Sequence, residues 1–133
     1  MTAADSQTSG VLRWALAVGA IAGLLAVAAG AFGAHGLRGV VGERGLAIFD
    51  TAASYQMYHA LALVAASLMP ALGLSRRLLA ACAVAWAVGI VVFSGSLYLL
   101  VLTSTPWLGA VTPLGGVSFI IGWALLAAAA LKR

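Results

Sequence analysis

Residues 14–36 read WALAVGAIAGLLAVAAGAFGAHG, an apolar run that contains no Asp, Glu, Lys or Arg. At about 1.5 Å per helical residue, a run of this length matches the ~30 Å hydrocarbon core of a bilayer. The run is too long and alternates too little for a barrel strand, and lipid admits only helices and closed barrels as spanning structures. We therefore predict a membrane-spanning helix over residues 13–32.

A cleavable signal peptide is the alternative interpretation of this first run. Arg13 precedes it, and the Ala-Ala-Gly-Ala sequence at residues 28–31 resembles a cleavage site. The apolar part of a signal peptide is usually ~7–15 residues long, however, and this run is longer. A permanent span is the favoured interpretation.

The composition extends the membrane interpretation to the whole chain. Of its 133 residues 64% are hydrophobic and only 8% are charged, which excludes an ordinary water-soluble domain. Three further apolar runs predict spans over residues 51–72, 78–102 and 112–131. The predicted fold class is all-α, a four-helix transmembrane bundle forming a single domain over residues 13–133, after a flexible tail over residues 1–12.

A short amphipathic segment is expected between the first and second spans. Residues 34–50 hold Arg38, Glu43, Arg44 and Asp50, with polar and apolar side chains on different sides of a helix. This pattern is typical of a helix lying in the membrane interface. Asp50 is alternatively an N-cap for the second span. At the fourth span, Thr112 followed by Pro113 predicts an N-cap with proline in the first turn.

The basic residues indicate an orientation. Five of the seven flank the predicted spans on one side: Arg13, Arg76, Arg77, Lys132 and Arg133. Arg38 and Arg44 lie on the other side. The positive-inside rule then places both termini in the cytoplasm of a bacterial plasma membrane, with the first and third loops outside. Because the net charge of +4 is spread over termini and loops, it does not indicate a nucleic-acid partner.

The remaining polar side chains are predicted to converge near the outer leaflet. The candidate cluster is His35, Arg38, Tyr55, Gln56, Tyr58, His59, Ser94, Ser96, Tyr98 and Thr112. Small residues at close spacing predict tight helix packing in lipid. The glycines assigned to that role are Gly19, Gly23, Gly30, Gly33, Gly115, Gly116 and Gly122.

Four ordered motifs carry a resemblance to a known family. They are Gly-Ala-Phe-Gly-Ala-His-Gly-Leu at 30–37, Tyr-Gln-Met-Tyr-His-Ala-Leu-Ala at 55–62, Phe-Ser-Gly-Ser-Leu-Tyr at 93–98 and Thr-Pro-Leu-Gly-Gly at 112–116. The chain resembles the membrane family called domain of unknown function 423, which includes eukaryotic transmembrane protein 256. The resemblance implies a small four-helix membrane protein without an established biochemical function. Its motif positions include Pro113 and all of the cluster except Arg38.

Several functions are open for the cluster. As a structural feature, its side chains form hydrogen bonds between helices. As a pocket, His59, Tyr55 and Gln56 bind a lipid, quinone or other amphiphile with Arg38 at the rim. As a metal or haem site, it depends on the two histidines, His35 and His59, because the single cysteine, Cys82, excludes multi-cysteine sites.

Transport and catalysis have less support in the sequence. The acidic residues Asp5, Glu43 and Asp50 lie outside the spans or at their edges, which disfavours proton-coupled export. No nucleophile and base occur at a catalytic spacing, so we expect no enzyme and no cofactor. The favoured function is a non-catalytic structural or accessory membrane protein. Its expected partners are the lipid bilayer and either another membrane protein or a second copy of the chain.

Overall fold

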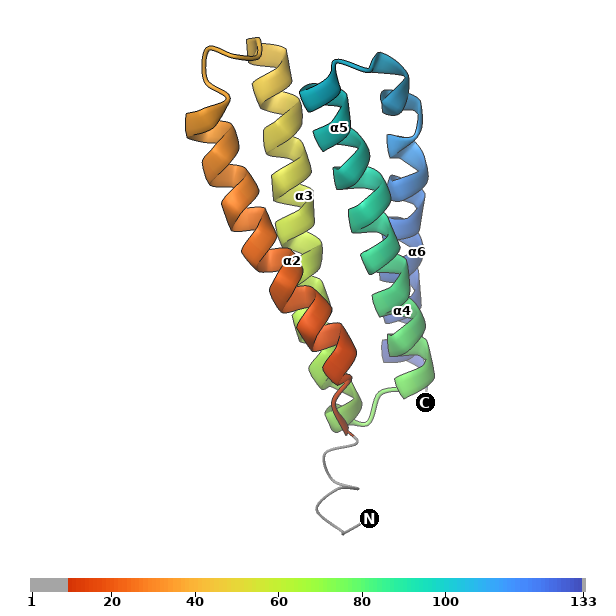
Figure 1. Cartoon of the computed structure of the whole chain (residues 1–133). Coiled ribbons are helices and arrows are strands. Elements are labelled where there is room, and N and C mark those ends of the chain that lie inside the picture. The colour runs from red at the N-terminus through yellow and green to blue at the C-terminus, as the bar shows by residue number, and fades with distance from the viewer. Residues whose placement is uncertain (1–9, 133) are drawn as a thin grey trace.

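The computed structural model describes residues 10–132, which run up and down through consecutive helices (Figure 1). The α-helices are α2 (Arg13–Ala31), α3 (Glu43–Leu68), α4 (Arg76–Gly89), α5 (Gly95–Thr103) and α6 (Thr112–Leu131). π-Helical turns occupy Phe32–Gly36 and Ile90–Ser94, and 3₁₀ turns occupy Met69–Leu72 and Pro106–Ala110. The second π-helical turn joins α4 and α5 into one rod. The all-α prediction is confirmed within the described residues, where no strand occurs.

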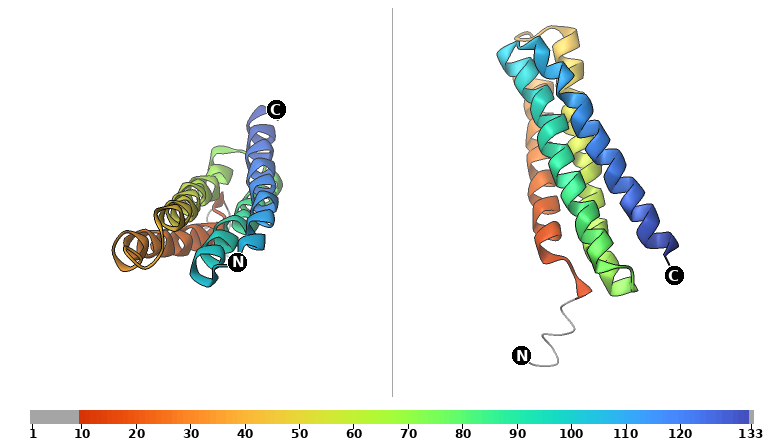
Figure 2. Two further views of the ribbon diagram at one scale, coloured as in Figure 1. Left: turned by 90° about the horizontal axis from the view of Figure 1, so that it is seen from above. Right: turned by 90° about the vertical axis from the view of Figure 1, so that its right-hand side faces the viewer.

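The helices are arranged as two pairs. α2 packs chiefly against α3, and α4 packs chiefly against α6, while α3 also contacts the α4–α5 rod along its length. Figure 2 shows the two pairs from above and from the side. α3 and the α4–α5 rod therefore form the centre of the bundle, and α2 and α6 lie on its flanks.

The outer surface of the bundle is apolar. Three stretches are long and apolar enough to cross a membrane, namely Arg13–Gly36, Arg76–Thr103 and Pro106–Leu131. Large apolar side chains project outward along α2 and α6, including Leu24 and Ile120 at 68% and 69% exposed. α3 has 26 residues and so a length of about 39 Å, but it carries more polar side chains than the other three rods.

The boundary of α3 differs from the sequence prediction. The helix begins at Glu43, after the N-cap Gly42, and not near Thr51. Residues 43–50 are the first two turns of this longer helix, with Phe49 buried and Asp50 exposed, so a separate amphipathic segment is not confirmed. The prediction that Asp50 is an N-cap is wrong because Asp50 lies inside the helix.

The start of α6 and the residues just before α2 also differ from the sequence prediction. The cap position of α6 is Val111, and Thr112 makes no capping bond, although the proline is in the first turn as predicted. Of the predicted tail over residues 1–12, residues 1–9 lie outside the described residues. Leu12 is buried at 2% exposed, and its amide donates to the carbonyl oxygen of Ser67 (2.8 Å), which ties the start of α2 to the end of α3.

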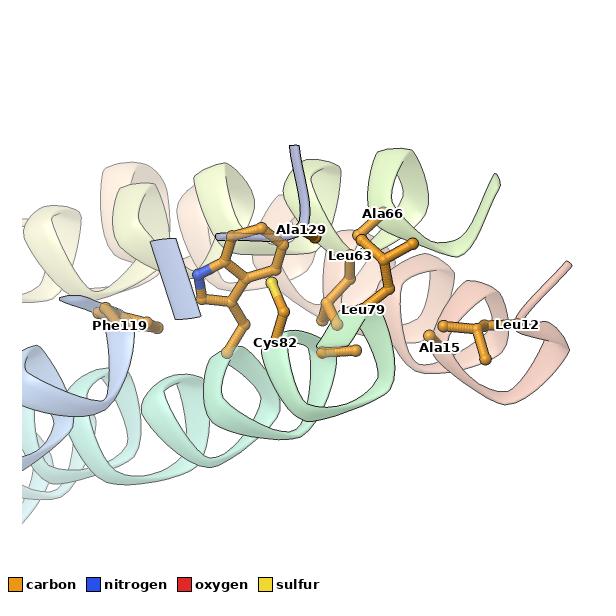
Figure 3. Close-up of a cluster of buried hydrophobic side chains, with 10 residues drawn as sticks. Leu12, Ala15, Leu63, Ala66, Leu79, Cys82, Phe119 and Ala129 are labelled. Carbon is orange, nitrogen blue, oxygen red and sulfur yellow. The ribbon is translucent and has the colours of Figure 1, made fainter. Parts of the chain in front are cut away.

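Buried apolar side chains form a main core toward the end of the bundle where α2 begins (Figure 3). This core consists of Leu12, Ala15, Leu63, Ala66, Leu79, Cys82, Ala83, Trp86, Phe119 and Ala129. A smaller core of Leu37, Phe49 and Val101 lies at the other end. Further buried residues outside these two cores include the polar Gln56, His59 and Ser94 as well as alanines.

Most of the predicted packing glycines lie at close helix contacts. A Cβ atom would lie 3.0 Å from the Ala60 carbonyl oxygen at Gly19, and 2.7 Å from the Phe49 ring at Gly33. At Gly122 it would overlap the Trp86 indole, and at Gly115 the backbone of Phe93. Gly23 and Gly116 have only ordinary contacts. Gly30 has no atom within 4 Å of the Cβ position, so its packing role stays a prediction.

We predict that Gly115→Ala destabilises the bundle and that Gly116→Ala does not. A Cβ at Gly115 would lie 2.7 Å from the Cα atom of Phe93, and a backbone atom has little freedom to move away. Overpacking of this kind costs about 1–3 kcal/mol. At Gly116 the nearest atom is 3.9 Å away, so the higher helix propensity of alanine is gained without a clash.

Thermal unfolding of both variants in the same detergent measures the difference. Equal midpoints for Gly115→Ala and Gly116→Ala would show that the close contact between α6 and the π-helical turn is absent.

Candidate functional site

Gln56 joins three helices. Its side-chain Nε2 atom donates to the carbonyl oxygen of Ala22 on α2 (2.9 Å). Its Oε1 atom accepts from the hydroxyl group of Tyr98 on α5 (2.7 Å). Gln56 is only 5% exposed, so both bonds lie inside the bundle. The side chain of one residue on α3 therefore links both neighbouring rods.

His59, one turn further along α3, has both ring nitrogens engaged. Trp123 on α6 donates from its indole Nε1 atom to Nε2 of His59 (3.1 Å). Because an indole N–H is only a donor, Nε2 is the unprotonated nitrogen and the proton is on Nδ1. Nδ1 then donates to the carbonyl oxygen of Tyr55 (2.8 Å). His59 is neutral and 4% exposed, without a free nitrogen to offer a metal or haem iron.

Aromatic rings surround the imidazole. The ring of Phe119 is stacked on His59 with the centroids 3.6 Å apart and the planes 8° from parallel. The ring centroids of Trp86 and Trp123 lie 6.3 and 6.0 Å from that of His59, both in edge-on arrangements. The ring centroid of Tyr55 lies 4.7 Å from that of Phe93, and the Phe93 centroid lies 5.4 Å from that of Phe119. The histidine is thus enclosed by side chains from α3, α4, α6 and the π-helical turn.

Serine and threonine hydroxyl groups link the remaining helices. Ser94 donates to the carbonyl oxygen of Ala52 on α3 (2.8 Å). The hydroxyl groups of Ser96 on α5 and Thr112 on α6 are 2.6 Å apart and hydrogen bonded. Ser118 on α6 donates to the carbonyl oxygen of Ala85 on α4 (2.6 Å). α6 therefore has one side-chain hydrogen bond each to α3, α4 and α5.

The π-helical turn Ile90–Ser94 aligns several of these groups. A π-helical turn holds one residue more than an α-helical turn, and it often occurs at functional positions in helices. Ser94 at its end is fully buried against α3, and the backbone of Phe93 lies against Gly115 of α6. The turn therefore brings α5 close to α3 and α6 at the same level.

The predicted cluster is divided in the structure. Tyr98 and Gln56 are bonded to each other, as are Ser96 and Thr112, while Tyr55 is stacked near His59. His35 and Arg38 are exposed, and no hydrogen bond within residues 10–132 joins either of them to the others. Tyr58 is 58% exposed, and its ring centroid lies 5.7 Å from that of Tyr55.

The depth of the cluster also differs from the prediction. Because α3 begins at Glu43, His59 lies about 24 Å along the helix and past its middle. Thr112 and Ser96 lie near the end where α5 and α6 are connected. The polar side chains thus follow the length of the bundle and are not gathered at one surface.

Four aromatic residues of the site were not predicted: Phe93, Trp86, Phe119 and Trp123. A signal existed for Trp123, because an indole N–H in the middle of an apolar span needs an acceptor and His59 is the acceptor-bearing residue within reach. Trp86 is fully buried, and its Nε1 atom has no hydrogen-bond partner among the described residues. Its burial against Gly122 gives no sequence pattern that would identify it.

Two adjoining cavities lie beside Gln56, between α2 and the α4–α5 rod. The lower cavity, of about 240 Å³, is bounded by apolar side chains that include Val18, Ile21 and Ile90. The upper cavity, of about 350 Å³, is bounded by Phe32, Phe49, Tyr98 and further apolar residues. Leu25 and Gln56 border both. A further cavity, of about 750 Å³, lies elsewhere, near Arg44 and Ser104 at the loop end of the bundle.

Comparison with known proteins gives one family. A family model described as "Protein of unknown function (DUF423)" matches residues 29–116. The UPF0382 membrane protein YwdK from Bacillus subtilis (strain 168) is 50% identical over 116 residues, covering 86% of this chain and 94% of that protein. UPF0382 membrane proteins from Staphylococcus epidermidis and Staphylococcus aureus are 46% and 44% identical, covering 86% of this chain and 93% of each relative. No solved structure matches the chain.

We predict that Gln56 and Tyr98 are energetically coupled. A double-mutant cycle of Gln56→Leu and Tyr98→Phe isolates their hydrogen bond, because each substitution removes one partner. Such bonds within membranes are worth about 0.6 kcal/mol on average and at most ~2 kcal/mol. The losses in free energy of unfolding caused by the two single substitutions should therefore sum to more than the loss in the double variant.

The matched control replaces Tyr98→Phe by Tyr58→Phe, since Tyr58 is on the same helix as Gln56 and makes no bond to it. Additive effects are expected for this control pair. Additive effects for Gln56 and Tyr98 as well would mean that their hydrogen bond does not form.

Proposed function

Because the chain belongs to the family described as protein of unknown function DUF423, whose similar members are named membrane proteins, we propose that it is a non-catalytic structural or accessory protein of the bacterial plasma membrane. The proposal concerns its role, since membrane location follows from the family and from the apolar helices. The support for this role comes from how the polar side chains are used.

The observation that carries the proposal is that three buried polar side chains, Gln56, His59 and Ser94, bond to neighbouring helices. Gln56 is engaged on both sides, and His59 has neither ring nitrogen free. Ser94 donates to a backbone carbonyl oxygen of another helix. A catalytic or metal-binding role needs a lone pair or proton available to a substrate. These side chains instead hold the bundle in one register.

The proposed arrangement has four spans, with α3 as the fourth. α3 is the most polar rod, but its Gln56 and His59 side chains are buried against the other helices. α2 and the α4–α5 rod cover α3 on two sides. The basic residues Arg13, Arg76 and Lys132 belong to the end of the bundle where α2 begins and α6 finishes (Figure 1). The positive-inside rule places that end in the cytoplasm.

We predict that a cysteine at Val40 is labelled from outside the cell and one at Leu72 is not. The two side chains are 74% and 76% exposed and lie in opposite loops. The native Cys82 is fully buried and supplies an unlabelled background. A membrane-impermeant maleimide added to intact cells should modify Val40→Cys, and Leu72→Cys only after permeabilisation. The reverse pattern would overturn the orientation.

The accessory role predicts a stable protein neighbour. After extraction in a mild detergent, native mass spectrometry should find the chain bound in a fixed ratio to another membrane protein or to a second copy. An unrelated four-helix membrane protein with the same affinity tag is the control for non-specific retention. A chain recovered only as a monomer, without any protein bound, would contradict the accessory role.

A further inference from the structure

We propose that the groove formed by the two adjoining cavities beside Gln56 binds an amphiphile with a flat, carbonyl-bearing ring and a single apolar chain, the chemistry of the isoprenoid quinones. The groove is lined by residues of α2 and the turn after it, of α3, and of the α4–α5 rod. This inference goes beyond the proposed function and does not depend on it. It concerns binding and includes no chemical step.

The upper cavity suits a ring. Its walls include Phe49 and Tyr98, whose centroids are 4.9 Å apart at 54°, and Phe32, which meets Phe49 edge-on at 6.0 Å. Aromatic walls of this kind favour a flat ring, because rings attract each other in offset or edge-on contact. A saturated hydrocarbon chain gains nothing from this arrangement beyond ordinary burial.

The lower cavity suits an apolar chain. Its lining residues are aliphatic apart from Gln56, including Val18 and Ile21 of α2 and Ile90 and Val91 on the opposite rod. Ile21 lies eleven residues before Phe32, so the chain would extend about 16 Å from the ring toward the middle of the bundle. A ring near the membrane surface with its chain directed inward is the orientation that an amphiphile adopts in a bilayer.

Gln56 supplies a polar contact at the junction of the two cavities. A glutamine amide has two N–H donors, and the described structure uses one of them, toward Ala22. The second N–H belongs to a side chain that is 95% buried yet borders both cavities. In such surroundings an unused donor favours a ligand with a carbonyl oxygen.

Charge distinguishes this ligand from a phospholipid. No residue bordering either cavity is charged. Arg38 borders a separate cavity, which it shares with the oppositely charged Asp50. A phosphate headgroup would therefore find no basic side chain in the groove, whereas an uncharged ring needs none.

The test uses ubiquinone-2 and the full chain in phospholipid nanodiscs, with binding followed by native mass spectrometry. One ubiquinone-2 should bind per chain. Ala29→Phe places a ring in the upper cavity and should weaken binding about tenfold, which is about 1.4 kcal/mol. The matched control is Ala28→Phe, an exposed neighbour on the same helix that does not border the groove, and its affinity should be unchanged.

Three further measurements make the result decisive. Gln56→Leu should weaken ubiquinone-2 binding while Tyr58→Phe leaves it unchanged. Palmitic acid, which has a chain and no ring, should bind more weakly than ubiquinone-2, and equal binding would overturn recognition of the ring. Thermal unfolding of Ala29→Phe confirms that the variant is folded. A folded Ala29→Phe that binds ubiquinone-2 as tightly as the parent protein would overturn the proposed site.

Discussion

The structure depends on the requirement that polar groups in hydrocarbon must find partners within the protein. α3 carries Gln56 and His59 in its interior-facing positions, and neither is favourable in contact with lipid. Gln56 resolves this by bonding to α2 and α5, and His59 by bonding to α6 and to its own helix. Each neighbouring helix is thereby linked to α3 by at least one specific bond or ring contact. The position of α3 at the centre of the bundle follows from this requirement.

The fold could be predicted from the sequence because apolar runs of about twenty residues have few alternatives. The α2 and α6 spans agree with that expectation to within a residue or two at their starts. The start of α3 could not be found in the same way, because three of residues 43–50 are charged and the segment does not continue the apolar run that begins near residue 51. The π-helical turn Ile90–Ser94 could not be predicted either, since its sequence Ile-Val-Val-Phe-Ser fits an ordinary apolar helix.

The candidate site was predictable in part. Gln56, Tyr98, Ser96 and Thr112 could be grouped because they are the rare polar residues of their spans. The direct pairs among them could not be derived, because pairing depends on the rotation and depth of each helix. His35 and Arg38 were included for their place after the first span, but they lie in the exposed connection. Trp123 was missed because indole is counted as apolar, although its N–H completes the bonding of His59.

The π-helical turn Ile90–Ser94 has a consequence for the way the sequence encodes the bundle. One additional residue in a helix rotates everything beyond it by about 100° relative to an uninterrupted α-helix. α4 presents Trp86 and Gly89 to α6, whereas α5 presents Ser96 to α6 and Tyr98 to α3. The number of residues between Gly89 and Gly95 therefore sets the relative orientation of the two halves of one rod. In this segment chain length carries structural information independently of residue type, much as a reading frame does in a gene.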